Sequence, residues 1–295
     1  MSAASEGRRS AVAALPFLLP FLCLLLLFQY VPMVMLLRDS MSSFTLFQPE
    51  LKRFVGWENF ARLVGDPGTR NSFVVTGLFA GGLLALVVPL ALALALLLNT
   101  RLPARALIRT IVLLPTITSA VVVATMWTLI LHPTSGLLNG MLAQIGIGPF
   151  DYLTSQHQAL PSLILMTLWQ QVGFAAMIFL AGLQRIPPDL IDAARIDGAS
   201  RLQRTLLITL PLLGRTTMLV VVMMTVFSLQ TFAPAYLMTS GGPQGSTNFL
   251  VHHIYVTAFS FQSPGFASAI SLGLLVVAFI VSLVQSALLR TRWMY

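Results

Sequence analysis

The strongest constraint on this chain is a set of six long apolar stretches without a charged side chain. A helix that crosses a bilayer needs about 20 consecutive apolar residues, and every stretch is longer than that. The stretches are 11–37, 72–98, 110–131, 160–183, 216–238 and 267–289. Only 9% of the 295 residues are charged, too few to cover a soluble fold of this size. The sequence therefore predicts an all-α membrane protein with six transmembrane helices.

Charged residues do not mark the limit between the fifth and sixth stretches, and the first stretch could be a signal peptide. Residues 216–289 contain no Asp, Glu, Lys or Arg, so the limit between the fifth and sixth stretches follows from the turn-forming residues 239–243 and 263–265. The first stretch follows Arg8 and Arg9 and resembles a signal peptide in that respect. It is longer than the 7–15 apolar residues of a signal peptide and ends at Leu36-Leu37-Arg38. We therefore interpret it as a retained membrane helix.

The distribution of basic residues predicts the orientation in the membrane. Loops on the cytoplasmic side of a membrane protein are enriched in Lys and Arg. With both termini in the cytoplasm, 12 of the 17 basic residues lie inside. These are Arg8, Arg9, Arg101, Arg105, Arg109, Arg185, Arg195, Arg201, Arg204, Arg215, Arg290 and Arg292. We therefore expect a multi-pass membrane protein with both termini cytoplasmic, which accounts for the net charge of +8 without nucleic-acid binding.

The polar residues inside the apolar stretches are all neutral. Ion-coupled carriers commonly place ionisable side chains within the membrane, and these stretches have none. A candidate path for a polyhydroxylated solute comprises Gln170, Gln171, Ser228, Gln230 and Thr231. The alternative is that these side chains hold neighbouring helices together.

The chain also lacks sequence signatures of nucleotide or metal binding. The phosphate-binding loop of ATPases needs a Gly-Lys-Ser/Thr sequence, and the single lysine, Lys52, follows Leu51. His252 and His253 are adjacent, so they cannot share a helix face as two metal ligands would. We expect no cofactor and no catalytic residue on this chain.

The segment 184–212 is predicted to form two short helices joined by a sharp corner. Pro187-Pro188 ends the preceding span, and Asp189 is expected to cap the next helix. That helix should end at Asp197-Gly198, since glycine tolerates the left-handed conformation that closes a helix. Ser200 and Gln203 have the spacing of a capping box for the second helix. The residues alone leave open whether this segment rests on the membrane surface or docks another protein.

This segment resembles the EAA motif of permease subunits of bacterial ATP-binding-cassette (ABC) importers, in particular the carbohydrate-uptake group. The motif reads Glu-Ala-Ala-x-x-Asp-Gly-Ala and is followed by Ile-x-Leu-Pro. The matching residues here are Asp192, Ala193, Ala194, Arg195, Ile196, Asp197, Gly198 and Ala199, then Ile208, Thr209, Leu210 and Pro211. The chain departs from the motif at Asp192, where glutamate is usual, and at Thr205, near which an aromatic residue is common. Residues 56–60, 133–139 and 239–243 are similar to further segments of the family.

The resemblance implies a type I ABC importer permease fold with a cytoplasmic coupling helix. Residues 1–71 would hold the N-terminal tail, the first transmembrane helix and an external loop, residues 72–290 a five-helix core with the coupling loop at 184–212, and residues 291–295 a cytoplasmic tail. It also implies a second permease chain, two copies of an ABC ATPase that bind ATP and magnesium, and an external substrate-binding protein or lipoprotein. The implied ATPase-coupling residues are Asp189, Asp192, Ala193, Ala194, Arg195, Asp197, Gly198 and Ala199. Those implied to contact the binding protein are Gly241, Gly242 and Pro243.

The solute is less constrained than the class of protein. Neutral polar groups in the spans favour a sugar or a related polyol. The same group of importers also takes up glycerol phosphate and glycerophosphodiesters, although these stretches offer no basic side chain to an anion. A stand-alone secondary carrier or channel is the alternative of a different class.

Overall fold

The computed structural model describes residues 17–100 and 103–289, and the fold is mostly helical. The chain divides into two compact units. The first comprises Met1–Gly65 and Ile254–Gly273, and the second comprises Asp66–His253 and Leu274–Tyr295. The predicted division at residues 71 and 72 stays a prediction.

The first unit begins with the apolar helix Phe17–Ser40, which includes η1 (Leu26–Tyr30) and α2 (Val31–Ser40). An antiparallel hairpin of β1 (Ser42–Thr45) and β2 (Gln48–Phe54) follows, and then α3 (Glu58–Gly65). Asn59 holds the start of this hairpin, because its Nδ2 donates to the carbonyl oxygens of Ser40 (2.8 Å) and Ser42 (3.0 Å). The hairpin adds a small sheet to the loop after the first span, which the helical prediction did not include.

The second unit is built around α4 (Pro67–Leu98), which packs along α8 (Ala159–Leu183). Asp66 begins α4, because its side chain accepts a hydrogen bond from the Thr69 amide (2.7 Å), the arrangement typical of a helix N-cap. Large apolar side chains from both helices are fully buried in this core, among them Phe79, Leu83 and Phe179. α12 (Gly214–Leu229) packs against both helices.

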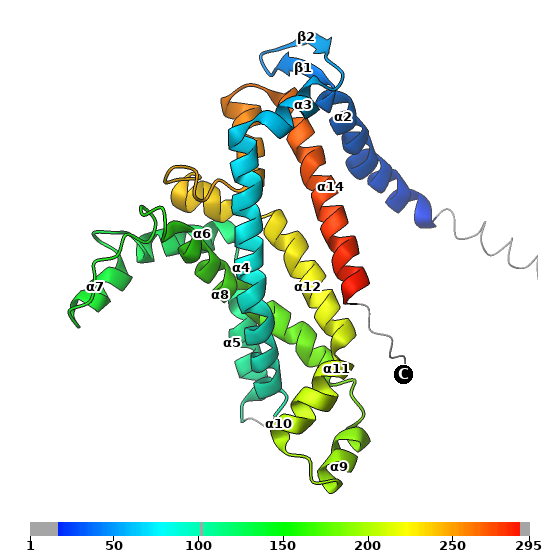
Figure 1. Cartoon of the computed structure of the whole chain (residues 1–295), viewed down its shortest axis with the longest axis vertical. Helices are drawn as coiled ribbons and strands as arrows, with labels where there is room; N and C mark the ends of the chain where they lie inside the picture. Colours follow the sequence, from blue (N-terminus) through cyan, green and yellow to red (C-terminus); the bar gives the residue numbers. More distant parts are fainter. Residues whose placement is uncertain (1–16, 101–102, 290–295) are drawn as a thin grey trace, which may run out of the picture. The chain divides into compact units, whose positions relative to one another are not determined.

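The remaining helices are shorter. They are α5 (Arg105–Ile117), α6 (Ala120–Ile130), α7 (Leu137–Ala143), α9 (Pro188–Ile196), α10 (Arg201–Arg204), η2 (Thr205–Thr209), α11 (Leu210–Leu212), η3 (Ala235–Thr239), α13 (Leu250–Tyr255), η4 (Val256–Ser260) and α14 (Pro264–Leu288). Within the second unit, α9 and α10 lie beyond the C-terminal end of α4 (Figure 1).

Four helices of the described chain are long and apolar enough to cross a membrane: Phe17–Ser40, α4, α8 and α14. Two bent pairs bring the number to six if each pair is one span. α5 and α6 meet at 91°, and Arg201–Leu212 meets α12 at 67°. The expected third span is therefore not a single straight helix, whereas the 67° bend lies just before the expected fifth span. Thr118, between α5 and α6, has extended backbone (φ −71°, ψ 138°), which interrupts the third. The fifth stops at Leu229, before Pro234, whose ring removes a backbone donor.

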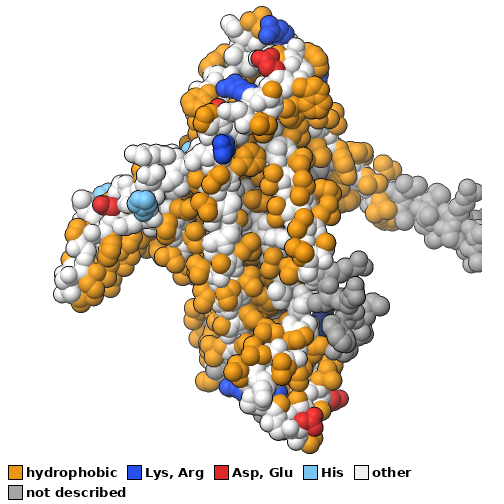
Figure 2. Space-filling model, in the orientation of Figure 1, with side chains coloured by type: hydrophobic (Ala, Val, Ile, Leu, Met, Phe, Trp, Pro, Cys, Tyr) orange, Lys and Arg blue, Asp and Glu red, His pale blue; other side chains and the backbone are white. Residues whose placement is uncertain are grey.

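The outward faces of the second unit are apolar. Leu78, Leu90 and Leu97 on α4 are each about half exposed (58%, 47% and 55%). Figure 2 shows hydrophobic side chains along the length of these helices, whereas Lys, Arg, Asp and Glu are seen toward the helix ends, including the end that carries α9 and α10. A surface of this kind suits lipid or other transmembrane helices rather than water.

Candidate functional site

The loop between α8 and α12 contains α9, the helix that matches the motif. Pro187 occupies the N-cap position of α9 and Pro188 its first position, where a missing amide donor costs nothing. Asp189 lies in the first turn and makes no capping hydrogen bond. The expectation that Asp189 caps this helix is therefore wrong, because the two prolines start the helix two residues earlier. Its carboxylate still lies at the positive end of the helix dipole.

The C-terminal end of α9 is closed by a Schellman motif. Gly198 has a φ of +80°, its amide donates to Arg195 O (3.2 Å), and the Ala199 amide donates to Ala194 O (2.9 Å). This pair of bonds satisfies carbonyls that a helix end otherwise leaves unpaired. A residue with a Cβ is strained at this φ. The predicted stop at Asp197-Gly198 is confirmed.

The second helix of the loop starts with the predicted capping box. Ser200 Oγ accepts from the Gln203 amide (3.3 Å), and the Ser200 amide donates to Gln203 Oε1 (2.8 Å). The helix continues through α10, η2 and α11 to Leu212. Only Ala199 separates Gly198 from Ser200. The corner between the two helices therefore lies directly between the Schellman motif that ends α9 and the capping box that begins α10.

The two faces of α9 differ. Ala194 is buried at 9% exposure and Ile191 is half-buried. Ala193, Ile196 (87% exposed) and Asp197 are exposed. Asp192 and Arg195 form an ion pair at 3.1 Å, but both side chains are more than 60% exposed, so water screens it strongly. The helix thus has an anchored inner face and a free outer face.

One polar residue of the expected solute path, Gln170, stabilises a break between helices. Gln170 and Gln171 are buried in α8. Gln170 Nε2 donates to Thr118 O (3.3 Å), and Gln170 O accepts from Thr116 Oγ1 (2.7 Å). Thr116 and Thr118 lie where α5 gives way to α6. Gln170 therefore binds the backbone of that break.

The other path candidates lie around the C-terminal end of α12. Ser228 Oγ donates to Thr225 O (2.8 Å), and Thr231 Oγ1 donates to Phe227 O (3.0 Å). Ser228 and Thr231 are buried, and Gln230 is exposed. Gln230 therefore has the most accessible polar side chain of the three. The assignment of a solute path to these residues stays a prediction.

The loop with the expected binding-protein contacts is held to α4. Thr247 Oγ1 donates to Gly242 O (2.7 Å), and Asn71 Nδ2 donates to Gly245 O (2.9 Å). A Cβ on Gly241 would approach the His252 ring to 2.7 Å. Pro243 is half-buried in the same loop. Gly241, Gly242 and Pro243 thus belong to a different loop from the coupling residues of 184–212.

Adjacent to that loop is a buried polar network that the sequence did not reveal. Thr69 Oγ1 lies 3.1 Å from His253 Nε2 and also bonds Asp66 Oδ2 (2.8 Å), while Asn248 Oδ1 lies 2.8 Å from His252 Nδ1. Burial lowers the pKa of both histidines. The neighbouring imidazole lowers the pKa of His252 further, and Asp66 partly offsets the decrease at His253. No cluster of three metal-ligating side chains occurs among the described residues.

A family model described as the inner membrane component of binding-protein-dependent transport systems matches residues 85–293. This match covers more than half of the chain and all of the coupling loop. The chain therefore belongs to that family: it is a multi-pass permease subunit of an ABC transporter in the inner membrane. The resemblance inferred from the EAA motif is confirmed. ATP binding belongs to the ATPase partner of such a subunit.

Relatives of known designation extend over nearly the whole chain. The trehalose/maltose transport system permease protein MalF of Thermococcus litoralis is 34% identical over 267 residues, covering 90% of this chain and 89% of the relative. The probable ABC transporter permease protein YurN of Bacillus subtilis is 33% identical over 279 residues, covering 93% and 95%. A chain of a bacterial alginate ABC transporter, crystallised with an alginate pentasaccharide-bound periplasmic protein, matches with a TM-score of 0.83 and 26% identity over 98% of both chains.

Proposed function

We propose that this chain forms, with a second related permease, the translocation path for a sugar or related polyol delivered by an external binding protein. Two copies of an ABC ATPase, with ATP and magnesium, would drive transport from the cytoplasm. Two observations support the solute class: the spans contain only neutral polar groups, and the relatives include a trehalose/maltose permease and an alginate transporter.

The geometry of the coupling loop is the main support for this proposal. α9 is fixed at its C-terminal end by the Schellman motif, and the following helix is fixed by the capping box. Such a rigid corner transmits a push applied to the exposed face of α9 into Arg201–Leu212 and then α12. ATP binding would supply the free-energy difference between the two states of the permease. The surface that the ATPase contacts would include Asp189, Ala193 and Asp197.

The orientation belongs to the same proposal. Both termini and the coupling loop would face the cytoplasm, as the 12 basic residues on that side favour. The loop with Gly241, Gly242 and Pro243 would then face the binding protein outside.

Replacement of Gly198 tests the coupling role. Gly198→Val places a β-branched residue at φ +80°, which costs about 1–2 kcal/mol or more and distorts the corner. No neighbouring atom lies within 4 Å of a Cβ at this position, so the transmembrane core should still form. We expect wild-type amounts of assembled complex but loss of ATP hydrolysis stimulated by the binding protein.

Gly140→Ala is the matched control, because Gly140 lies in α7 with open space around its Cβ position. Stimulated hydrolysis should be unchanged in this variant. Normal stimulation in Gly198→Val would exclude the proposed coupling role.

The solute class is tested on the binding protein of the same transporter. A thermal-shift titration should show stabilisation by a sugar or an oligosaccharide. Stabilisation by glycerol phosphate or a glycerophosphodiester alone would replace the sugar assignment and leave the coupling mechanism intact.

A further inference from the structure

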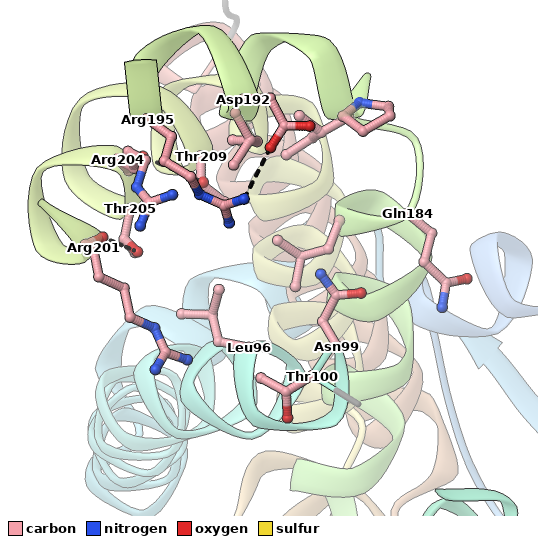
Figure 3. A pocket seen from close by; sticks show the side chains of 14 residues that line it. Leu96, Asn99, Thr100, Gln184, Asp192, Arg195, Arg201, Arg204, Thr205 and Thr209 are labelled. Carbon is pink, nitrogen blue, oxygen red and sulfur yellow. Dashed lines mark hydrogen bonds and ion pairs between the residues drawn. The ribbon is translucent and has the colours of Figure 1, made fainter. Parts of the chain in front are cut away.

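An open cavity of about 740 Å³ lies on the inner side of the coupling loop. Its walls come from the C-terminal ends of α4 and α8, from α9 and from the helix that follows (Figure 3). The polar side chains that matter for its chemistry are Asn99, Gln184, Asp192, Arg195, Arg201 and Arg204. All of them belong to the second unit, so the cavity is formed within one compact body.

The cavity lies on the side of α9 away from Ala193 and Asp197, although Asp192 and Arg195, which the resemblance also implies in coupling, belong to its lining. Pro188, Ile191, Asp192 and Arg195 line it, and their spacing of three and four residues places them on one side of α9. The exposed residue Ile196 does not line it. A ligand in the cavity would therefore not need to compete for the outer face of the coupling helix.

Positive charge dominates the lining. Three arginines face a single carboxylate, Asp192, which is already paired with Arg195 at 3.1 Å. Among the described residues, no ion pair is found for Arg201 or Arg204. In the view of Figure 3 the guanidinium groups of Arg195 and Arg204 lie near each other, whereas that of Arg201 points toward the end of α4, where Leu96 and Thr100 are drawn.

The strongest indication of a ligand is the guanidinium of Arg204. Its Nε is buried and has no hydrogen-bond partner within the described part of the chain. A buried donor on a charged group is costly when it is unpaired, which favours an anion beside this guanidinium. No hydrogen bond joins this Nε to Thr205 or Thr209 in the described part of the chain. Their hydroxyls donate to the carbonyl oxygens of Arg201 (3.0 Å) and Arg204 (3.3 Å).

We propose that this cavity binds a phosphate group. A phosphate monoester or diester offers several oxygens to forked guanidinium donors, and clustered arginines are the usual way in which proteins hold it. Basic pockets at the cytoplasmic ends of transmembrane helices bind phospholipid headgroups in other membrane proteins. The group is carried either by an anionic lipid or by a soluble phosphate. The cytoplasmic location of the cavity rests on the orientation proposed above. The existence of the cavity and its positive charge do not depend on that orientation.

The test uses the full chain, purified in detergent with its transporter partners and stripped of lipid. Inorganic phosphate is titrated by calorimetry, and phosphatidylglycerol binding is counted by native mass spectrometry against a phosphate-free galactolipid. No ATP, sugar or binding protein is added, so a failure of transport does not affect the result.

Arg201→Gln with Arg204→Gln removes the two arginines without an ion pair, and Arg215→Gln is the control. Arg215 is exposed at the start of α12 and does not line the cavity. We expect the double variant to lose about tenfold or more in affinity, as the loss of a charge-assisted hydrogen bond predicts. Arg215→Gln should bind within about twofold of the wild type, a difference well below one such bond. Arg201→Lys with Arg204→Lys keeps the charge and should retain intermediate affinity.

Saturable binding of inorganic phosphate would identify a soluble ligand, and selective retention of phosphatidylglycerol would identify a lipid headgroup. Both results support the site if the double Gln variant loses them. Wild-type binding in that variant, or no binding of either probe to the unaltered complex, would overturn the proposal.

Discussion

Two glutamines in the apolar stretches show how the same side chain serves different roles. Gln170 bonds the backbone at the break between α5 and α6, whereas Gln230 is exposed at the end of α12. Their sequence environments are alike, since both follow an apolar run. Only the fold distinguishes them, because Thr118 lies 52 residues from Gln170 in the sequence.

These environments give opposite expectations for substitution by leucine. Gln170→Leu leaves the Thr118 carbonyl without its donor and should lower the free energy of unfolding by about 1–3 kcal/mol. Gln230→Leu should leave thermal stability unchanged and reduce uptake of the solute. Thermal unfolding of the purified complex and uptake by vesicles separate the two effects. Equal loss of stability in both variants would remove Gln230 from the solute path.

At the scale of elements, short-range features could be predicted from the sequence and long-range ones could not. The end of α9 and the capping box depend on residues one to five positions apart, so Gly198, Ser200 and Gln203 revealed them. The break between α5 and α6 escaped detection because hydropathy reports how apolar a stretch is and not its direction. The hairpin β1–β2 was not predicted, because its two short strands lie in a loop and contain no long apolar stretch.

Contacts between distant elements form the other group that the sequence did not reveal. The amide of Leu250 donates to Thr76 Oγ1 (2.8 Å), and His253 reaches Thr69, each across more than 170 residues. From the sequence, the adjacent His252 and His253 could only be judged a poor pair of metal ligands. His253 joins α13 to the start of α4 through Thr69, whereas His252 bonds Asn248 of the preceding loop.

This junction predicts that the protein loses stability in acid. His252 and His253 lie in the loop between the expected fifth and sixth spans, and their pKa values are lowered from 6.5, chiefly by burial. The unfolded chain therefore binds protons before the folded chain as the pH falls. The free energy of unfolding should be constant above about pH 7 and should decrease below about 6.5.

Thermal unfolding of the complex at a series of pH values measures this effect. Replacing both histidines, His252→Asn with His253→Gln, should flatten the decrease between pH 6.5 and 5. His132→Asn, at an exposed position before α7, should leave it as in the wild type. The same steep decrease in the double variant would assign the acid sensitivity to other groups.

At the scale of the whole molecule, we propose that the chain supplies part of a solute path and the element that couples it to an ATPase, and that it works together with other chains. Its described helices expose large apolar side chains, and its family places it in a transport system with a binding protein. The absence of charged groups from the apolar stretches, read from the sequence, still argues against an ion-driven carrier. The energy source therefore belongs to a partner, and the coupling loop is the part of this chain suited to receive it.

Solute uptake into proteoliposomes tests this account most directly. The chain is reconstituted with its partner permease, ATPase and binding protein, and accumulation of the labelled sugar bound by that protein is measured. We expect accumulation only when ATP is on the ATPase side and the binding protein is on the other, and none from this chain alone under a proton or sodium gradient. Gradient-driven uptake by the isolated chain, without ATP, would contradict the account.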